Sequence, residues 1–381
     1  MMYKLLPIPL LILTLFIYPT EVHSMATPPP HKYIPIRVLV VERAPEIILR
    51  IKGSYRIIDL GTKEVLSEGK SLRRHTISRE DISSEGIRIL SEKRTRIYIN
   101  RRRFRGDIDI IKNEDSTLMV VNHIDLELYL YGVLYHEVSH RWLMEVLKAQ
   151  AIAARTYALY QKLISKNRYY DLASDIYSQV YGGRSSETWP TSRAVNLTQG
   201  RILTYNGEVF PSYYHATCGG HTSDASTIWD IDIPVLQSRI CNFCKRSPHY
   251  EWRRELTMEH IEDKLQDGGY NIQLRSIEIL GRDEAGRILE MILKGEPKDI
   301  KLNGDKFRLA VHPNTIKSTN FEIKARSRYI TFYGKGWGHG IGMCQWGAYG
   351  MARRDWSAEE ILEYYYPDSS ITRVGDEDIR F

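Results

Sequence analysis

Short stretches in which apolar and polar residues alternate dominate the first third of the chain. Between residues 36 and 119 they read IRVLVVE, IILRIKG, YRIID, IRIL and RIYIN, and Gly, Ser and charged residues separate them. A period of two residues is typical of strands that bury one face. The pattern predicts a small all-β region over residues 36–119, whose role the sequence does not indicate, and a strand-like run, LMVVNHIDLELYLYGVL, follows it.

The pattern changes at Trp142. The segment Trp142–Ser165 contains no Gly or Pro and has five alanines, which predicts one continuous helix that packs closely against its neighbours. Lys148 and Arg155 are two turns apart on this helix, so both cations are expected to face one groove; a solvated helix face is the alternative.

Mixed Tyr-rich segments follow, with short helices expected at Met258–Gln266 and Ala358–Tyr366. The sum predicts an α+β fold: a mixed, β-rich domain over residues 120–381 around one long buried helix, preceded by the small all-β region.

The first residues resemble a targeting signal. MMYK, the apolar run LLPIPLLILTLFIYP and the end VHSMA have the three parts of a secretory signal peptide, which predicts removal of residues 1–24, or cleavage after Ala26. A Pro-rich linker over residues 25–35 follows. We therefore expect a secreted protein, in the periplasm or cell wall, with no stable membrane span after cleavage.

The charge of the chain is mildly basic, with 53 Lys and Arg against 47 Asp and Glu. A net charge of +6 suits a polyanionic surface such as a cell wall, and nucleic acid is not expected as the partner of an exported protein. The densest basic run, RRRFR at residues 101–105, predicts a charged hairpin that keeps an edge strand soluble.

Glu137 is the main candidate for catalysis. It stands within HEVSH, residues 136–140, which satisfies the H-E-x-x-H pattern of zinc proteases. That reading lacks a third ligand downstream, and the motif lies at or before the start of the long helix instead of within it.

A single carboxylate suits a different reaction. A lytic transglycosylase needs only one, because the 6-hydroxyl of the muramic acid attacks its own anomeric carbon and no water has to be activated. Apolar neighbours predict a raised pKa for Glu137, as a general acid requires. The alternative is an exposed Glu that complements the N-terminus of the long helix.

A glycine-rich string near the C-terminus contains further candidate substrate-binding residues. GWGHGIGMCQWGAYGMA, from residue 336, is too rich in glycine for a helix or ordinary strand, so its backbone must pass close to another segment. It is expected to bring His339 and Gln345 beside Glu137 as substrate-binding groups, with Trp337 and Trp346 available to stack on sugars. The alternative is a tight structural crossover packed on the long helix, in which the two tryptophans and His339 have structural roles.

The cysteines form a second candidate site. Cys218 and His221, followed by Cys241 and Cys244, have the spacing of a structural zinc site, and a disulfide in an oxidising compartment is the equal alternative. Cys344 is expected to be a free, buried residue in both cases.

Several long motifs together resemble one family. They are the run from Glu137 through WLMEVLKAQAIAARTYAL, QVYGG, RILTYNGEVFPSYYHATCGGHT, SPHYEW and GWGHGIGMCQWGAYGMARRDWSAEEILEYYYP. They are similar to the stage II sporulation protein D family, which includes the amidase enhancer LytB, from about residue 120 to the end.

The resemblance implies a function. It gives Glu137 as the catalytic acid and base of a peptidoglycan lytic transglycosylase, with Lys148, Arg155 and Tyr250 lining the cleft for glycan strands that lack stem peptides. No cofactor is required for this chemistry. The alternative within the family is a non-catalytic wall-binding protein that stimulates a cell-wall amidase.

The resemblance also bears on metal. Some members bind zinc through a cluster just before QVYGG, but Ala173, Tyr177 and Ser178 stand at those positions here. The family's site is therefore not expected, and the CGGH and CNFC segments are candidates to replace its structural role.

Overall fold

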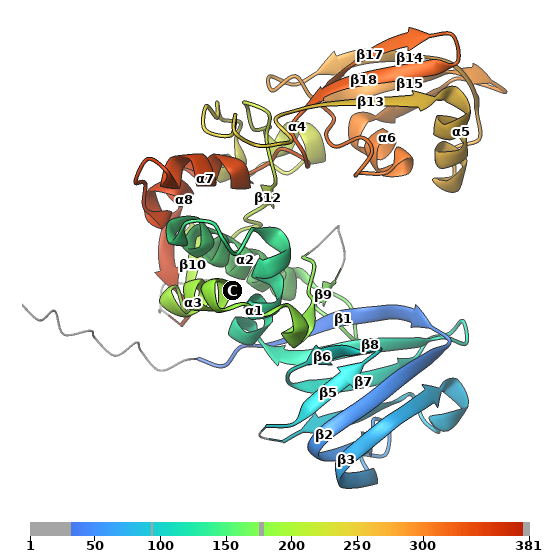
Figure 1. The fold of residues 1–381 in the computed structure, drawn as a ribbon, viewed down its shortest axis with the longest axis vertical. Helices are drawn as coiled ribbons and strands as arrows, with labels where there is room; N and C mark the ends of the chain where they lie inside the picture. The colour runs from blue at the N-terminus through green and yellow to red at the C-terminus, as the bar shows by residue number, and fades with distance from the viewer. Residues whose placement is uncertain (1–31, 93, 175–178, 376–381) are drawn as a thin grey trace, which may run out of the picture. The chain divides into compact units, whose positions relative to one another are not determined.

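The computed structural model describes residues 32–92, 94–174 and 179–375 and has a β-rich α+β fold (Figure 1). The predicted signal peptide, most of the linker, Tyr177 and Ser178 lie outside the described residues. No helix in the described ranges is long and apolar enough to cross a membrane.

The N-terminal strands form one nine-stranded sheet with the order β6-β5-β2-β4-β7-β8-β1-β9, and β3 pairs with β2. Its strands are β1 (Pro35–Ala44), β2 (Glu46–Asp59), β3 (Val65–Ser78), β4 (Gly86–Ser91), β5 (Arg96–Ile99), β6 (Arg102–Phe104), β7 (Asp107–Lys112), β8 (Leu118–Asp125) and β9 (Leu172–Ala173). All pairs are antiparallel except β1 with β9. Strand β8 crosses the predicted domain boundary at residues 119 and 120, so the sheet continues into the segment that carries the candidate site.

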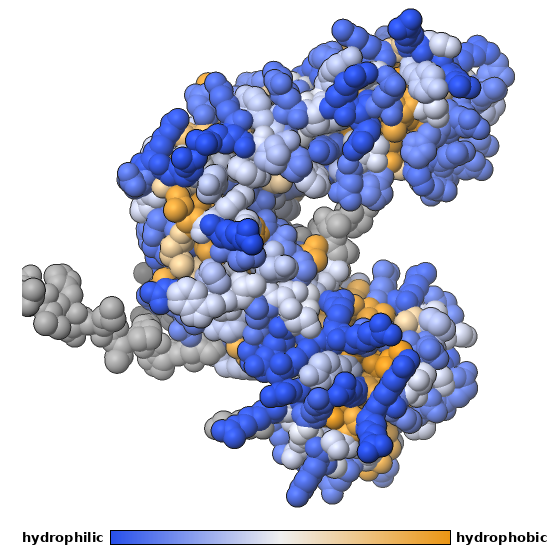
Figure 2. All heavy atoms as spheres, viewed as in Figure 1, coloured by the Kyte–Doolittle hydropathy of each residue, from blue (hydrophilic) through white to orange (hydrophobic). Residues whose placement is uncertain are grey.

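The basic run at residues 101–105 forms the hairpin that the sequence predicted. Asn100 and Arg101, both with positive φ, make the turn between β5 and the edge strand β6. Figure 2 shows hydrophilic side chains over this region of the sheet, with apolar residues visible between them. Arg105 also pairs with Glu187 through two bonds of 2.5 and 2.7 Å, so the run additionally fastens the hairpin to the segment after QVYGG.

The strand-like run after residue 118 is only half strand. After β8 the chain turns into helix α1 (Leu126–Glu137), whose N-cap Asp125 accepts a bond from the Glu127 N–H at 3.0 Å. Helix α1 is buried on most sides, and a short, uniformly apolar run does not distinguish a buried strand from a buried helix. Glu137 therefore ends a helix, and the prediction that it precedes one was incomplete.

The long helix α2 (Met144–Ile164) matches the predicted segment closely, and its residues from Val146 to Leu159, except Lys148, are buried. Its alanines let α1 and the sheet approach, since one hydrophobic core joins sheet residues, α1, Ala151, Ala154 and Ala158. Around it lie α3 (Trp189–Leu197), β10 (Arg201–Tyr205), β11 (Glu208–Val209), α7 (Gln345–Ala352), α8 (Ala358–Tyr365) and β20 (Ser370–Arg373).

A second group of strands and helices has its own hydrophobic core. It contains β13 (Glu251–Thr257), α5 (Met258–Asp267), β14 (Gln273–Arg282), β15 (Ile288–Glu296), β16 (Ile300–Asn303), α6 (Gly304–Val311), β17 (Phe321–Arg326) and β18 (Tyr329–Lys335). The helices expected near residues 258 and 358 are confirmed as α5 and α8, while α6 was not predicted.

Two short strands join the special motifs. β12 (Tyr214–His215), from YYHATCGGHT, pairs in parallel with β19 (Met343–Cys344), from the glycine-rich string. Gly342 has φ +66°, and a Cβ there would lie 2.0 Å from the Tyr213 carbonyl oxygen, so only glycine fits. The expected close backbone approach is confirmed. Helix α4 (Ala225–Trp229) follows β12 in the sequence.

Candidate active site

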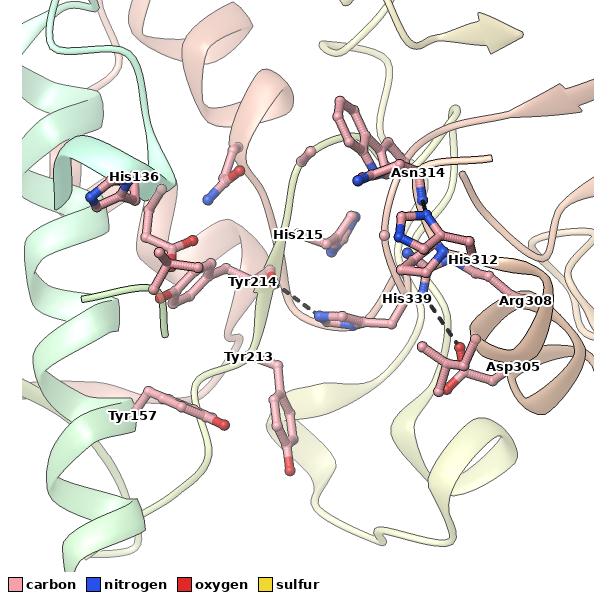
Figure 3. Close-up of a pocket in the computed structure, with 18 of the residues that line it drawn as sticks. His136, Tyr157, Tyr213, Tyr214, His215, Asp305, Arg308, His312, Asn314 and His339 are labelled. Atoms are coloured by element: carbon pink, nitrogen blue, oxygen red, sulfur yellow. Dashed lines mark hydrogen bonds and ion pairs between the residues drawn. The ribbon is translucent and has the colours of Figure 1, made fainter. Parts of the chain in front are cut away.

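A cavity of about 580 Å³ lies where the YYHATCGGHT segment and the glycine-rich string meet the end of α1. Figure 3 shows labelled residues of its lining, which come from α1, α2, β12, α6 and the loop before β19. This volume is within the range of pockets that enclose small molecules or one end of a longer chain. Its lining includes Glu137, Tyr157, Val180, Tyr213, Tyr214, His215, Trp229, Asp305, Arg308, Trp337, His339 and Gln345.

Glu137 lies at the C-terminus of α1, in the wall of this cavity. Burial raises the pKa of its carboxyl from the usual 4.5 to about 7, against hydrogen bonds from the Val180 backbone and the Gln345 side chain that lower it. The negative end of the helix dipole also disfavours a carboxylate there, which is the reverse of the N-terminal position considered from the sequence. The predicted raised pKa is confirmed, and the carboxyl can hold a proton near neutral pH.

Gln345 is brought beside Glu137. It is the first residue of α7, it is buried, and its Nε2 also donates to Gln150 Oε1 on α2 at 3.3 Å. The amide is therefore held between α2 and the candidate acid, as the sequence predicted for its position.

His339 lies in the same cavity, but backbone groups occupy both of its ring nitrogens. Nδ1 accepts from the Ile341 N–H at 3.1 Å, so Nε2 carries the proton and donates to the Tyr214 carbonyl at 3.0 Å. Burial drives its pKa well below the usual range, which keeps the ring neutral. The bond to Tyr214 ties the glycine-rich loop to β12, and the bond from Ile341 holds the loop itself, so His339 has a structural role besides any contact with substrate.

His215 is a site residue that the sequence analysis missed. It is buried, and burial together with Arg287 lowers its pKa to about 3. Its Nδ1 donates to the Ile341 carbonyl at 3.0 Å, which leaves Nε2 as an acceptor with no partner in the described part of the chain. An unpaired acceptor in the cavity wall is suited to a substrate O–H or N–H. Its place inside YYHATCGGHT was the signal that could have found it.

Aromatic rings form much of the cavity wall. Trp229 and Trp337 both line it, and the Trp229 ring packs 4.8 Å from the rings of Tyr213 and His339. Trp346 instead packs on Trp142 at 5.1 Å, outside the lining. Trp346 therefore belongs to the structural crossover, whereas Trp337 can contact a ligand in the cavity.

The cavity contains a second carboxylate. Asp305 on α6 lies 3.7 Å from the Arg308 guanidinium, and Figure 3 places it across the cavity from His136. The sequence offered no second carboxylate near Glu137 because α6 has the pattern of an ordinary amphipathic helix. Glu145 is elsewhere, paired with Lys148 at 2.8 Å and bonded to the Ala358 N–H.

Arg155 is not in the cavity lining. It is fully buried, and its guanidinium makes two 2.7 Å bonds to the Glu127 carboxylate. The same group donates to the Arg201 carbonyl at 3.0 Å. The structure thus gives Arg155 a place inside the core instead of the predicted place in a substrate groove beside Lys148.

Tyr250 is also not among the lining residues. Its carbonyl accepts from the Gly336 N–H at 3.0 Å, and its ring packs against the core that contains the cysteines. Lys148 is half-buried beside Glu145. The structure does not bring Lys148, Arg155 and Tyr250 together with Glu137 in one cavity.

The histidines of HEVSH have other partners. His136 Nε2 lies 2.7 Å from Ser186 Oγ, and the His140 ring stacks on Tyr135 at 5.8 Å. Helix α1 ends at Glu137, so no single helical turn presents both imidazoles. This arrangement does not support the zinc-protease alternative.

Two family models match the chain. Residues 114–205 match the model described as stage II sporulation protein, and residues 235–342 match a domain of unknown function (DUF8618). The cavity draws Glu137 from the first range and Asp305 and His339 from the second.

Curated relatives cover most of the chain. An uncharacterized protein of Brachyspira hyodysenteriae is 32% identical over 346 residues, which is 87% of this chain and 91% of the relative. Stage II sporulation protein D of Bacillus subtilis is 31% identical over 67% of this chain and 76% of its own length. The amidase enhancer of Bacillus subtilis is 26% identical over 64% of this chain and 40% of its own length.

Proposed function

Because the chain belongs to the stage II sporulation protein D family, we propose that it is an exported peptidoglycan lytic transglycosylase with Glu137 as its single acid and base. The substrate would be glycan strands without stem peptides, and the bond cleaved would join muramic acid to glucosamine. The observation that carries the proposal is a carboxyl with a pKa of about 7 in the wall of a partly aromatic cavity.

The reaction moves two protons, one out of the Glu137 carboxyl and one back into it. Neutral Glu137 protonates the glycosidic oxygen, and the bond from that oxygen to the anomeric carbon breaks. The resulting carboxylate then takes the proton of the muramic 6-hydroxyl while its oxygen bonds to the anomeric carbon. The product is a 1,6-anhydro sugar, and Glu137 is again protonated.

Charge at the end of α1 favours this path. The transition state is positive at the anomeric carbon, so the newly formed carboxylate and the negative end of the helix dipole both stabilise it. His215 would accept a hydrogen bond from the sugar or its N-acetyl group, and Trp229 or Trp337 would pack on an apolar sugar face. Lys148 is a proposed contact for the strand outside the cavity.

The chemical identity of the products tests the proposal. Purified protein incubated with denuded glycan strands is expected to release fragments with anhydro ends, lighter than hydrolysis products by one water. Mass spectrometry after borohydride reduction separates the two, because only a hydrolytic end gains two hydrogens. Reducible ends would contradict the mechanism. Binding without release, with stimulation of an added amidase, would instead support the amidase-enhancer alternative, which the 26% identical relative suggests.

The rate is expected to depend on pH through Glu137. Its acid form starts the reaction, so kcat should be near its plateau at pH 6 and fall about tenfold per unit well above pH 7. Initial rates at constant ionic strength measure this, with strand binding followed separately at each pH. A rate that is unchanged between pH 6 and 9 would exclude Glu137 as the general acid.

A further inference from the structure

Four cysteines from three separate segments meet in the core. Cys218 follows β12, Cys241 and Cys244 form the CNFC segment, and Cys344 ends β19. All four are buried, and their sulfur atoms lie within 4.8 Å of one another. The pair Cys218 and Cys244 has its sulfurs 3.5 Å apart.

We propose that Cys218, Cys241, Cys244 and Cys344 bind one structural Zn²⁺ as a tetrathiolate site. With Zn–S bonds of about 2.3 Å, the edge of the tetrahedron is about 3.8 Å, which suits four sulfurs this close together. An iron–sulfur cluster would place several metal and sulfide atoms between the thiolates and hold them farther apart. Two cysteines separated by two residues also form half of a typical zinc site.

Hydrogen-bond donors already point at the sulfurs. The N–H groups of Cys218 and Gly347 both lie 3.3 Å from Cys344 Sγ, and the Tyr365 hydroxyl lies 3.2 Å from Cys241 Sγ. Such bonds to ligand atoms are the usual surroundings of a metal site, because they stabilise thiolates. A Cβ on Gly347 would lie 2.9 Å from Cys241 Sγ, so helix α7 can pack this closely only through a glycine.

A buried cation lies near the cluster. Arg287 is fully buried and donates to the carbonyl oxygens of Cys218 and Gly338 at 3.2 and 2.9 Å. Its Nε has no hydrogen-bond partner among the described residues. Four thiolates around Zn²⁺ carry a net charge of −2, which would add to the nearby Asp283 carboxylate in offsetting this guanidinium, whose bonds to Cys218 and Gly338 are both to neutral carbonyls.

The fourth ligand differs from the sequence prediction. His221 was expected to complete the site, but its Nδ1 lies 2.9 Å from the Thr222 carbonyl and its side chain is outside the cluster. Cys344, expected to be a free residue, takes its place. The CGG turn after Cys218 and the glycine-rich string meet here because β12 and β19 pair.

The proposed zinc would also hold one wall of the cavity in place. Cys344 immediately precedes Gln345, whose amide bonds Glu137. A metal that holds Cys344 would therefore hold the start of α7 and the position of Gln345. The metal site itself does not rest on the proposed reaction.

Metal content of the purified chain tests this proposal. Mass-spectrometric metal analysis is expected to find about one zinc per chain and no iron. Cys344→Ser should lose most of the zinc, whereas His221→Ala, the matched control from the same region, should keep all of it. With cobalt in place of zinc, strong sulfur-to-cobalt absorption is expected from the wild type and His221→Ala, and less from Cys344→Ser.

Other results would overturn the site. Zinc retained by Cys344→Ser and lost by His221→Ala would restore the His221 ligand set. Iron with sulfide, or a metal-free chain with two thiols blocked in a disulfide, would exclude it. If Cys344→Ser does not fold, alkylation of the wild type decides: all four thiols should be protected and become reactive together when a chelator removes zinc, so independent reactivity would contradict the proposal.

Discussion

Replacing Glu137 with glutamine is expected to lower kcat for strand cleavage by at least about a thousandfold. Glutamine keeps the size and the hydrogen-bonding capacity of the side chain but has no proton to give at neutral pH. Strand affinity should change little, since the amide still fills the same place beside Gln345 and Val180. Single-turnover rates and binding to denuded strands, measured on the same preparation, separate the two effects.

The second carboxylate provides the control. Asp305→Asn should keep most of the activity, because a lytic mechanism uses one carboxyl and Asp305 lies near Arg308. Loss of activity as large as in Glu137→Gln, together with reducible product ends, would indicate a hydrolase with two catalytic carboxyls. Full cleavage by Glu137→Gln would exclude the proposed mechanism.

The free energy of unfolding of Glu137→Gln, compared with wild type as a function of pH, provides a second test and shows that the variant is folded. The raised pKa of Glu137 means that the folded protein keeps a proton that the unfolded chain releases as pH rises from 4.5 to 7. This carboxyl thus opposes folding above pH 7 and has no such effect below pH 4.5. After allowance for partial solvent screening, Glu137→Gln should be more stable than wild type by about 1 kcal/mol at pH 8 and equal to it in acid.

Replacing Arg155 with alanine is expected to reduce the free energy of unfolding by about 3–5 kcal/mol. The change leaves the buried Glu127 carboxylate without the guanidinium that neutralises it through two bonds. It also frees the carbonyl of Arg201. Thermal unfolding should show a fall in Tm on the order of 10 °C.

Matched variants separate this structural role from substrate binding. Arg155→Lys should remain strongly destabilised, because an ammonium lacks the planar fork that matches a carboxylate. Arg155→Met combined with Glu127→Leu should recover most of the loss, since neither buried charge remains. Lys148→Ala, at the partly exposed pair, should cost less than about 1 kcal/mol. An Arg155 variant of normal stability that fails only to bind strands would contradict the structural role.

Local pattern was sufficient for several elements. Helices α2, α5 and α8 and the basic hairpin are each specified by a periodicity or turn within one segment. Glu137 and Gln345 were also found from the sequence, because rare residue types in long motifs indicate a shared site. The apolar run after residue 118 was not resolved, since burial on all sides removes the period that distinguishes helix from strand.

The amino-acid sequence by itself determined the family, the candidate acid and the residues rich in chemistry, because these depend on which residues are present and in what order. Only the tertiary structure decided their partners. Arg155 pairs with Glu127, 28 positions away, and Cys344 joins Cys218 across 126 positions. Asp305 and His215 reach one cavity from distant segments. Such contacts arise when strands pair and helices pack across the fold, and no spacing along the chain records them.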